Sequence, residues 1–460
     1  MRENRAQKRA SARVAALANG CHLWRMDKER PDLTRFDLVI VGAGLNGSLL
    51  ALAAGEAGLT TALIDRMALT TLSQAGFDGR TTAVAYTSQR LFAAVGVWDE
   101  VAADAEPIRD IRISDAGHDG KASRFFLHFD HREAADEGAS RSGDDDAPIA
   151  PAAPMGWIVE NRFLRAALLR RLAACRNVEL IAPDEVTDSS RTLDKAEVTL
   201  KSGRRIAARL IASAEGRFGS MREEAGIGAR AWSYDQIAIV LVAQHERPHR
   251  GVAQEKFLPG GPFAILPMTD GKNGEHRSSI VWTERADLAR RLLELDPPRF
   301  QAEFARRFGN HLGAVSPSGP RWWYPLGLVH AERYVDTRLV LVGDAAHGIH
   351  PIAGQGYNLG VRDIAALVEV LVDAKRLGLD VGSADTLERY AQWRRTDNLT
   401  MVAATDLLNR LFSNDFGPLR LARDLGLAAV NRVPQLRRFF VRHAMGLVGD
   451  LPKLIRGERP

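Results

Sequence analysis

The stretch Asp37-Leu-Val-Ile-Val-Gly-Ala-Gly-Leu-Asn-Gly47 decides the fold of this chain. Its apolar run predicts a short buried strand that starts near Phe36, and the following residues predict an Ala- and Leu-rich helix through about Ala57. Thr60–Asp65 predicts a second strand. A strand–helix–strand unit of about 30 residues implies two parallel strands joined by a right-handed crossover.

The glycines of this stretch have the spacing of a dinucleotide fingerprint. Gly42 allows the tight turn, Gly44 lets the backbone approach a pyrophosphate, and Gly47 permits close packing of helix on strand. The helix start then offers free N–H groups and a partial positive charge to phosphates. Asp65 ends the second strand, where its carboxylate can accept hydrogen bonds from ribose hydroxyls and disfavours a 2′-phosphate. The fingerprint alone does not separate NAD from FAD.

A second glycine-rich motif follows the apolar strand predicted at Leu339–Val342. It comprises Val342-Gly-Asp-Ala-Ala-His-Gly-Ile-His-Pro351 and Ala353-Gly-Gln-Gly-Tyr-Asn-Leu-Gly360, and a helix is predicted over Asp363–Ala374. Asp344 stands at the C-terminal end of a strand, where α/β folds bind ligands, and it can accept hydrogen bonds from a polyol. Gly354 and Gly356 free backbone N–H groups at the next helix start. The alternative is that Asp344 caps a helix and the glycines only form turns.

Composition excludes several classes of protein. The chain has 460 residues, 45% hydrophobic and 26% charged, as expected of a globular protein, and no apolar run reaches the roughly 18 residues of a membrane span. The two cysteines, Cys21 and Cys175, provide neither a zinc ligand set nor a disulfide framework. Residues 1–25 carry six basic groups and one acidic group, which accounts for the net charge of +5. The remainder is formally neutral, so charge gives no support to nucleic-acid binding.

Together with Ala-Glu-Gly-Arg at 214–217, the two motifs resemble those of the class A FAD-dependent aromatic monooxygenases. Four further stretches resemble the ubiquinone-biosynthesis hydroxylases: Asp78-Gly-Arg-Thr-Thr-Ala83, Val159-Glu-Asn-Arg162, Gly261–Pro267 and Phe439–Leu447. The first of these is most similar to the 2-polyprenyl-6-methoxyphenol hydroxylase branch. The resemblance covers about residues 36–457.

The resemblance implies an α/β fold in which a Rossmann-like FAD-binding domain contains an inserted antiparallel β-sheet substrate domain and is followed by C-terminal helices. Alternating runs between residues 235 and 285 fit the inserted sheet. The expected parts are a disordered leader (1–35), a discontinuous FAD-binding domain (36–110, 155–225 and 326–375), a substrate domain (111–154 and 226–325) and a helical C-terminal segment (376–460).

The family also implies roles for single residues. The FAD-binding set is expected to hold the pyrophosphate, the adenosine ribose, the ribityl chain and the flavin ring. Its members are Gly42, Gly44, Gly47, Asp65, Arg66, Arg80, Gly343, Asp344, Pro351, Gly354, Gln355, Gly356 and Asn358. Arg80 is expected along the FAD, near the phosphates or the flavin ring. His350 and Pro351 are expected beside the flavin. The middle motif departs from the family pattern, because Glu215 replaces an Asp and Gly219 stands where a Ser is usual.

The implied activity is hydroxylation of the aromatic ring of a polyprenylated phenol in ubiquinone biosynthesis. In this family reduced flavin reacts with O₂ to a hydroperoxide that delivers oxygen to the ring, so no protein residue is assigned as catalytic and no metal is expected. NAD(P)H is the expected donor, although the altered middle motif leaves its contact open. Two alternatives remain: a hydroxylase of a soluble aromatic substrate, and a non-catalytic flavin-bound scaffold of a biosynthetic complex.

The C-terminal segment suggests a contact with lipid. Residues 416–460 hold nine basic and three acidic groups, and Leu436–Val448 mixes bulky apolar and basic residues at helical spacing. An interfacial helix on anionic lipid within 436–460 and an ordinary packed helix are both compatible with this pattern. We expect a cytoplasmic protein, peripheral on the inner face of the plasma membrane under the first alternative. Expected partners are the phenol, O₂ and other ubiquinone-pathway proteins, with no nucleic acid.

Overall fold

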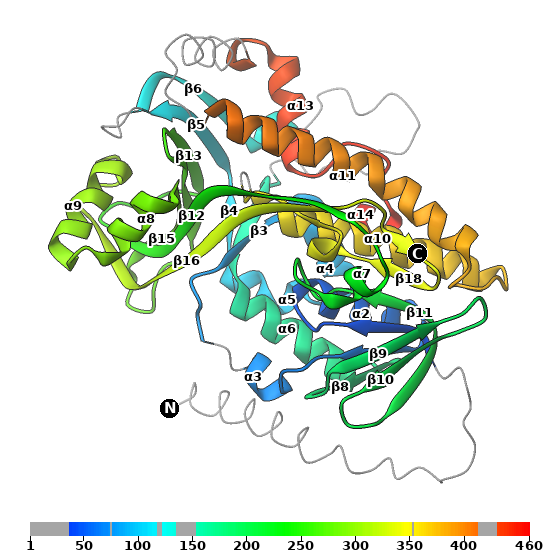
Figure 1. The fold of residues 1–460 in the computed structure, drawn as a ribbon. Helices are drawn as coiled ribbons and strands as arrows, with labels where there is room; N and C mark the ends of the chain where they lie inside the picture. Colours follow the sequence, from blue (N-terminus) through cyan, green and yellow to red (C-terminus); the bar gives the residue numbers. More distant parts are fainter. Residues whose placement is uncertain (1–35, 74–75, 117–121, 135–152, 352–353, 413–429) are drawn as a thin grey trace, which may run out of the picture.

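The computed structural model describes residues 36–73, 76–116, 122–134, 153–351, 354–412 and 430–460. The predicted leader lies outside the described residues. Three sheets and the helices around them form the molecule (Figure 1). The predicted α/β fold class is confirmed.

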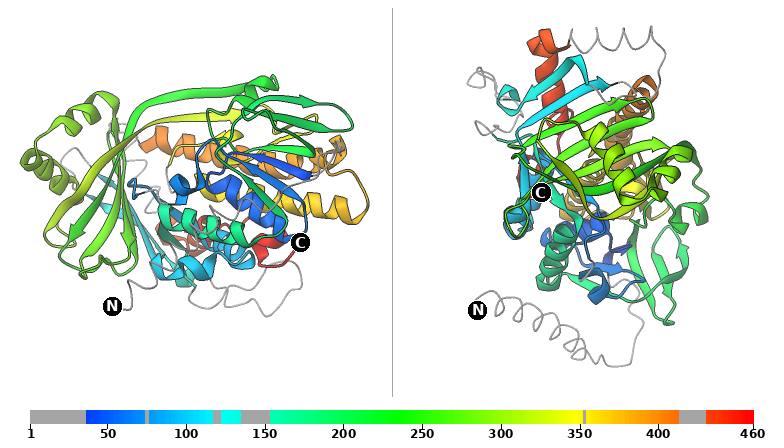
Figure 2. Two further views of the ribbon diagram at one scale, coloured as in Figure 1. Left: turned by 90° about the horizontal axis from the view of Figure 1, so that it is seen from below. Right: turned by 90° about the vertical axis from the view of Figure 1, so that its left-hand side faces the viewer.

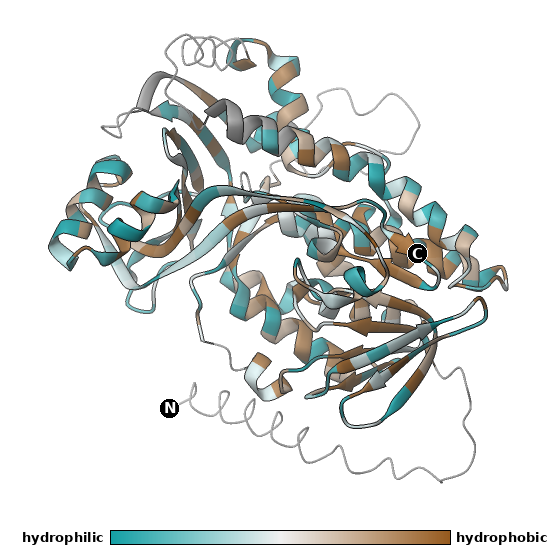
Figure 3. Cartoon of the chain, in the orientation of Figure 1, coloured by the Kyte–Doolittle hydropathy of each residue, from teal (hydrophilic) through white to brown (hydrophobic). Residues whose placement is uncertain are grey.

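The first sheet contains the predicted strand–helix–strand unit. Its five parallel strands are β18 (Leu339–Leu341), β11 (Arg205–Ser213), β1 (Phe36–Val41), β2 (Thr61–Ile64) and β8 (Val178–Ile181), in that order. Antiparallel strands extend it: β17 (Val335–Asp336) beside β18, and the β9–β10 pair (Val186–Arg191, Ala196–Leu200) beside β11. Because helices cover the parallel strands, their runs are apolar almost throughout (Figure 3).

Three long helices pack around this sheet. They are α2 (Leu45–Glu56), α6 (Asn161–Ala174) and α10 (Gly356–Arg376). Leu49, Leu164 and Ile364 on these helices are all fully buried in one core with Leu38 of β1. The helix predicted over Asp363–Ala374 therefore begins seven residues earlier than expected, directly on the second glycine motif.

The second sheet is the predicted antiparallel insertion. Its strands are β19 (His347–Gly348), β16 (Val315–Ala331), β12 (Ala229–His245), β15 (His276–Arg285), β14 (Gly261–Met268), β13 (Val252–Leu258), β5 (Asp110–Ala116) and β6 (Ala122–Asp130), in that order. Only the β13–β5 pair is parallel. The two 17-residue strands β12 and β16 run together from this sheet toward the first one (Figures 1 and 2). The predicted boundary at residues 325 and 326 falls within β16.

Two helices that the sequence did not single out cover the outer face of this sheet. Helix α8 (Ala286–Glu294) is followed by α9 (Pro297–Phe308), whose Phe300 and Phe304 pack against Trp282 and Phe263. Asp296 caps α9 by accepting a hydrogen bond from the Arg299 N–H at 2.9 Å. An Asp followed by two prolines is a helix-start signal that was available in the sequence.

A small third sheet joins the two larger ones. It contains β3 (Thr81–Ala85), β7 (Gly156–Glu160) and β4 (Ala105–Ile108). The shorter elements are α3 (Leu69–Ser73), α4 (Tyr86–Ala94), α5 (Trp98–Val101), η2 (Ala102–Asp104), η3 (His131–Ala134), α7 (Ser220–Glu224) and η4 (Gly343–Ala345). Through β3 this sheet connects the Asp78–Ala83 stretch to the rest of the fold.

The C-terminal part is helical, as predicted. Helix α11 (Ala384–Phe412) packs along α10, and α13 (Pro434–Ala444) and α14 (Lys453–Arg456) follow (Figure 1). Leu454 and Ile455 of α14 are buried in the core of the first sheet. No helix in the described ranges combines the length and apolar composition that a membrane crossing requires.

Candidate active site

Three loops leave the first sheet side by side at one edge. Val41 at the end of β1 is in register with Ser213 of β11, and Ser213 is in register with Leu341 of β18. The first glycine motif, the Ala214–Arg217 segment and the second glycine motif therefore start from three adjacent strands. The carboxyl edge of a parallel sheet, where the chain turns to opposite sides, is the usual ligand site of such folds.

The first glycine motif forms an open cradle at the start of α2. Gly42 has φ +101°, and a Cβ there would lie 2.8 Å from the Ala214 carbonyl oxygen, while a Cβ at Gly47 would lie 1.8 Å from the Gly42 oxygen. A Cβ at Gly44, by contrast, would meet no atom of the described part of the chain within 4 Å. Among the described residues, no side chain caps α2, whose first turn begins after Gly44. The cradle thus has free space and free N–H groups for an anion such as a pyrophosphate.

Asn46 connects the two glycine motifs. A Cβ built on Gly343 would lie 2.1 Å from Asn46 Nδ2, and one built on Gly360 would lie 2.6 Å from Asn46 Oδ1. The Asn46 side chain thus occupies the space that the two glycines leave. Sequence reasoning did not select this residue, because its importance depends on a contact that only the folded sheet creates.

Asp65 and Arg66 follow β2 at the same edge. The Asp65 carboxylate accepts hydrogen bonds from the Ala43 N–H at 2.6 Å and from the Met67 N–H at 2.8 Å. Asp65 therefore stabilises the turn of the first glycine motif through the Ala43 N–H. Arg66 is exposed next to it. The expected ribose contact stays a prediction.

Arg80 lies on a turn that packs against the second sheet. Gly79 has φ +81°, and a Cβ there would lie 2.3 Å from the Trp322 ring. Arg80 Nε donates to Asp78 Oδ2 at 2.8 Å, and its guanidinium lies 5.7 Å from the Tyr324 ring centroid. The Tyr324 hydroxyl donates to the Asp78 carbonyl oxygen at 3.1 Å. The turn is thus fixed by β16, and the exposed Arg80 is the predicted FAD contact on it.

Asp344 lies in η4, just beyond the C-terminal end of β18, as predicted. Burial raises the pKa of its carboxyl group, against the opposing charges of Arg217 and His347. None of the described residues donates a hydrogen bond to this carboxylate. A partly buried acceptor without a donor is costly, and hydroxyl groups of a polyol would satisfy it.

Beneath this loop lies a buried charge cluster that the sequence analysis missed. Asp363 Oδ2 accepts from the Gly343 N–H at 3.1 Å and contacts His347 Nε2 at 2.5 Å. Asp363 Oδ1 accepts from Arg394 Nε at 2.8 Å and Asn398 Nδ2 at 3.1 Å. Burial opposes the charged form of Asp363, yet His347 and Arg394 hold its pKa far below the ordinary value. The cluster fixes the second glycine motif to α10 and α11.

The rest of the second motif surrounds the start of α10. Gly354, Gln355 and Gly356 lie at its first turn, and Pro351 is exposed before residues 352 and 353, which lie outside the described ranges. The Asn358 amide is fully engaged: Oδ1 accepts from the Ala85 N–H and the Ser88 hydroxyl, and Nδ2 donates to the Ala83 and Gly354 carbonyl oxygens. Asn358 therefore holds the second glycine motif against β3 and α4. Because its side-chain amide is used in these bonds, any contact of Asn358 with a ligand would have to come from its backbone.

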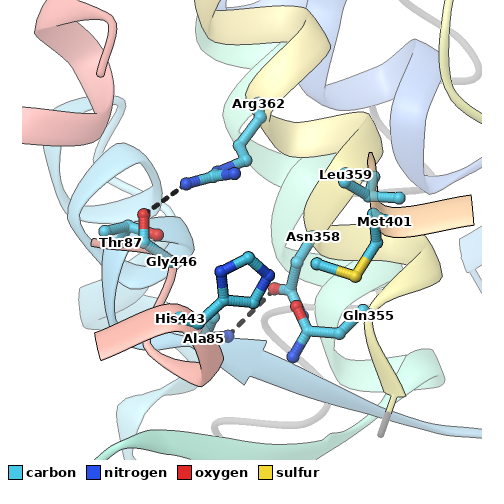
Figure 4. Close-up of a pocket in the computed structure, with 9 residues that line it drawn as sticks. All are labelled: Ala85, Thr87, Gln355, Asn358, Leu359, Arg362, Met401, His443 and Gly446. Atoms are coloured by element: carbon cyan, nitrogen blue, oxygen red, sulfur yellow. Dashed lines mark hydrogen bonds between the residues drawn. The ribbon is translucent and has the colours of Figure 1, made fainter. Parts of the chain in front are cut away.

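A small pocket opens beside this turn (Figure 4). The guanidinium of Arg362 on the pocket wall is engaged in hydrogen bonds within the protein. It donates to Asp397 and to the Gly446 and Val448 carbonyl oxygens. The pocket lies between α10, α4, α11 and the end of α13, and it is lined by Ala85, Thr87, Gln355, Asn358, Leu359, Arg362, Met401, His443 and Gly446.

In the middle motif, Glu215, which stands where the family usually has Asp, contacts residues of its own loop. Glu215 Oε2 accepts from the Ser213 hydroxyl at 3.0 Å and from the Met221 N–H at 3.3 Å, and burial raises the pKa of its carboxyl group. The Arg222 guanidinium donates to the Arg217 carbonyl oxygen at 3.3 Å. Glu215 thus stabilises the loop between β11 and α7.

The cradle at Gly44, the carboxylate of Asp344 and the joining Asn46 fit one extended ligand held at both ends. The FAD-binding-domain family model matches residues 35–404. A ubiquinone hydroxylase from Rhodospirillum rubrum, UbiL, is 50% identical over 424 residues, covering 92% of each chain. The chain belongs to the FAD-dependent ubiquinone-biosynthesis hydroxylases.

Other comparisons agree with membership of these hydroxylases. The 3-demethoxyubiquinol 3-hydroxylase of Escherichia coli is 35% identical, and the match covers 89% of this chain and 98% of that protein. The solved structure of p-nitrophenol 4-monooxygenase PnpA from Pseudomonas putida superposes with a TM-score of 0.72 at 18% identity, covering 91% of this chain and 99% of that one. That likeness shows the fold. FAD as cofactor is confirmed, whereas the 2-polyprenyl-6-methoxyphenol branch stays a prediction.

Proposed function

We propose that this hydroxylase acts on the aromatic ring of a polyprenylated phenol, with O₂ as the oxygen source and NAD(P)H as the electron donor. The observation that carries the proposal is the placement of the two glycine motifs at one sheet edge, next to the aromatic inner face of the second sheet. The names of the relatives support the substrate class. FAD, when bound, supplies the redox chemistry and the activation of O₂.

We assign the binding of FAD to the residue set predicted from the sequence. Gly42, Gly44 and Gly47 give the pyrophosphate its cradle, and Asp65 with Arg66 lies at the adenosine end. Arg80 follows on the turn beside β16. Gly343 and Asp344 receive the ribityl chain. The flavin ring is bordered by Pro351, Gly354, Gln355, Gly356 and Asn358, with His350 beneath them.

The second sheet provides the substrate side of the site. Ala238 and Val240 of β12 pack with Leu326 of β16, flanked by Trp322 and Tyr324. This face is apolar and aromatic, so it can pack on a phenol ring and exclude water. Water must be excluded, because water that reaches the flavin favours the side reaction in which the electrons convert O₂ to H₂O₂. We assign the substrate domain to residues 111–154 and 226–325. We assign the FAD-binding domain to residues 36–110, 155–225 and 326–375.

We also propose that α13 rests on an anionic membrane surface at the cytoplasmic face. Leu436, Phe439 and Phe440 of this helix are all more than 40% exposed, and Arg438 stands among them. Apolar side chains with basic neighbours on one helix favour an interface of anionic lipid. Leu454 and Ile455 of α14 are buried in the protein core and are not available to lipid. We therefore limit the proposed membrane contact, predicted within residues 436–460, to α13. Other pathway enzymes remain proposed partners.

Product analysis under ¹⁸O₂ tests the activity. Purified holoenzyme with NADH or NADPH and a short-chain prenylated phenol should yield a ring-hydroxylated product with one ¹⁸O atom. A soluble phenol without the prenyl tail should react far more slowly. Equal turnover of the soluble phenol would favour the alternative of a hydroxylase for a soluble aromatic substrate, and NAD(P)H oxidation without any labelled product from either phenol would contradict the proposal.

Vesicle flotation tests the membrane contact. The wild-type protein should float with vesicles of equimolar phosphatidylcholine and phosphatidylglycerol, and the double variant Leu436→Ser, Phe439→Ser should not. Leu377→Ser is the matched control, because Leu377 is 71% exposed at the end of α10. Flotation that is the same for the double variant and the wild type would exclude α13 as the contact.

A further inference from the structure

The pairing of strand β12 with β16 is irregular where β12 passes the second glycine motif. Ser233 pairs with Gly327 of β16 and Gln236 pairs with Leu326, so the register shifts between them, and Tyr234 and Asp235 form a bulge. Asp235 has φ +52°, a left-handed conformation that is uncommon for a residue other than glycine. Bulges often redirect a side chain next to an active site. Here the redirected side chain is that of Tyr234.

Tyr234 contacts two other elements of the molecule. Its ring lies edge-on to the His350 ring, with 5.0 Å between centroids and 82° between planes. Its hydroxyl donates a hydrogen bond to Asp406 Oδ1 on α11 at 3.0 Å. A single side chain of the second sheet is thus fixed to α11 and packed against the loop that carries the second glycine motif.

His350 is the loop residue that receives this contact. Its side chain is fully buried, and the residues before it, His347 and Gly348, form β19 against β16. Burial lowers the pKa of His350 to about 4, against the raising effect of Asp406, so the ring is neutral near pH 7. Ile349, next in the chain to His350, joins an apolar cluster with Leu359 and Met401, against which Tyr234 packs.

We propose that Tyr234, held by Asp406, and His350 form a clamp that fixes the second glycine motif against the substrate sheet and so limits solvent access to the bound flavin. Tyr234 and His350 are positioning residues in this proposal. The chain's membership of the FAD-binding family establishes the flavin as its cofactor. The effect of the clamp on hydroxylation rests on the function proposed above.

The clamp affects how the electrons of NAD(P)H are used. In the coupled reaction one oxygen atom of O₂ enters the ring and the other leaves as water, with two electrons from NAD(P)H and one proton from solvent. In the uncoupled reaction the same two electrons and two protons convert O₂ to H₂O₂. A loosened loop admits water and favours the second outcome.

The first test uses holoenzyme without substrate. Tyr234→Phe keeps the ring but removes the bond to Asp406, and Asp406→Ala removes it from the other side. Both should at least double the Stern–Volmer constant for iodide quenching of the bound flavin's fluorescence. Asp406→Asn, which keeps an acceptor oxygen, should restore the wild-type value.

The matched control is Tyr390→Phe on the same helix α11. It removes a buried tyrosine hydroxyl that donates to the Leu341 carbonyl oxygen at 3.0 Å. It should lower the melting temperature without increasing quenching. Quenching that is unchanged in Tyr234→Phe and Asp406→Ala, or equally increased in Tyr390→Phe, would overturn the clamp.

The second test measures coupling with a prenylated phenol. The fraction of NAD(P)H electrons recovered in H₂O₂ should rise at least threefold in Tyr234→Phe, while the KM for the phenol changes less than twofold. A wild-type fraction would contradict the effect on coupling. If the wild-type enzyme hydroxylates no phenol, the proposed function fails, and iodide quenching still decides whether the clamp exists.

Discussion

The side-chain amide of Asn46 occupies the space beside Gly343, where a Cβ would lie 2.1 Å from Asn46 Nδ2. The two residues belong to different glycine motifs that are far apart in the chain. The same amide lies against Gly360, where a Cβ would be 2.6 Å from Oδ1. This contact makes the two halves of the FAD site one packed unit, so a change in one motif is expected to reach the other.

Replacing Gly360 with alanine tests this packing. In an ordinary helix interior, Gly→Ala stabilises by about 1 kcal/mol. Here the new methyl group would collide with Asn46, and overpacking costs about 1–3 kcal/mol. We expect Gly360→Ala to lower the melting temperature and weaken FAD retention. The control is Gly76→Ala, because a Cβ at Gly76 would meet no atom within 4 Å. A higher melting temperature for Gly360→Ala would show that Asn46 does not fill this space.

Gly44→Ala should separate folding from cofactor binding. Gly44 has φ −64°, which alanine adopts without strain, and a Cβ there meets no protein atom within 4 Å. Stability of the apoprotein should therefore change by less than about 0.5 kcal/mol. The methyl group would project into the cradle, so we expect FAD affinity to fall about tenfold or more, which is about 1.4 kcal/mol. Titration of apoprotein with FAD, followed by flavin fluorescence, measures the loss, and wild-type affinity would remove the pyrophosphate from this cradle.

The features predicted from the sequence are those that local chemistry determines. The unit Phe36–Asp65 was identified correctly because an apolar strand, a glycine turn and a helix follow one another directly. The antiparallel insertion was identified from alternating runs, and in the Pro259–Pro262 stretch between two of its strands Pro259 and Gly260 form the turn. Gly261 and Pro262 already pair with Leu258 and Phe257 in the β13–β14 ladder. Pro262 is tolerated there although proline suggests a turn.

The features that were missed depend on contacts between distant segments. Asp363 looked like an ordinary helix residue, and its four hydrogen-bond partners come from Gly343, His347, Arg394 and Asn398. The start of α10 at Gly356 was missed because its first turn is stabilised by Asn358, which binds Ala83 and Ala85 of β3. A single sequence does not reveal such partners, because they are brought together only by the sheet.

Asp363→Asn should be strongly destabilising. The substitution removes a buried charge and leaves Arg394, which is 1% exposed, with Asp397 as its remaining carboxylate partner. Breaking a buried ion pair costs about 3–5 kcal/mol. We expect a loss of that order in urea unfolding, together with weaker FAD retention through the Gly343 loop.

The double variant Asp363→Asn, Arg394→Leu provides the control for charge. Removing both partners leaves no uncompensated guanidinium, so it should recover part of the stability that Asp363→Asn loses. Asp397 keeps Arg362 as a partner at 2.8 Å in this variant. Equal stability of the single and double variants would mean that the charge of Asp363 contributes little.

Acid should destabilise the protein through its buried histidines. Burial lowers the pKa of His330 and of His350 to about 4, from the ordinary value of 6.5 for histidine. Between pH 6.5 and 4 the unfolded chain therefore binds more protons than the native state, and stability falls as the pH falls through this window. Each histidine should contribute a slope of up to about 1.4 kcal/mol per pH unit.

Urea unfolding of apoprotein at pH values between 8 and 4.5 measures this slope. Near pH 8 these two histidines are neutral in both states, so the slope of the unfolding free energy that they cause should be close to zero there. His330→Gln keeps a polar group beside the Tyr334 hydroxyl, which lies 2.9 Å from His330 Nε2, and it should reduce the slope below pH 6.5. If the unfolding free energy stays constant down to pH 4.5, or if His330→Gln has the wild-type slope, burial does not keep His330 neutral.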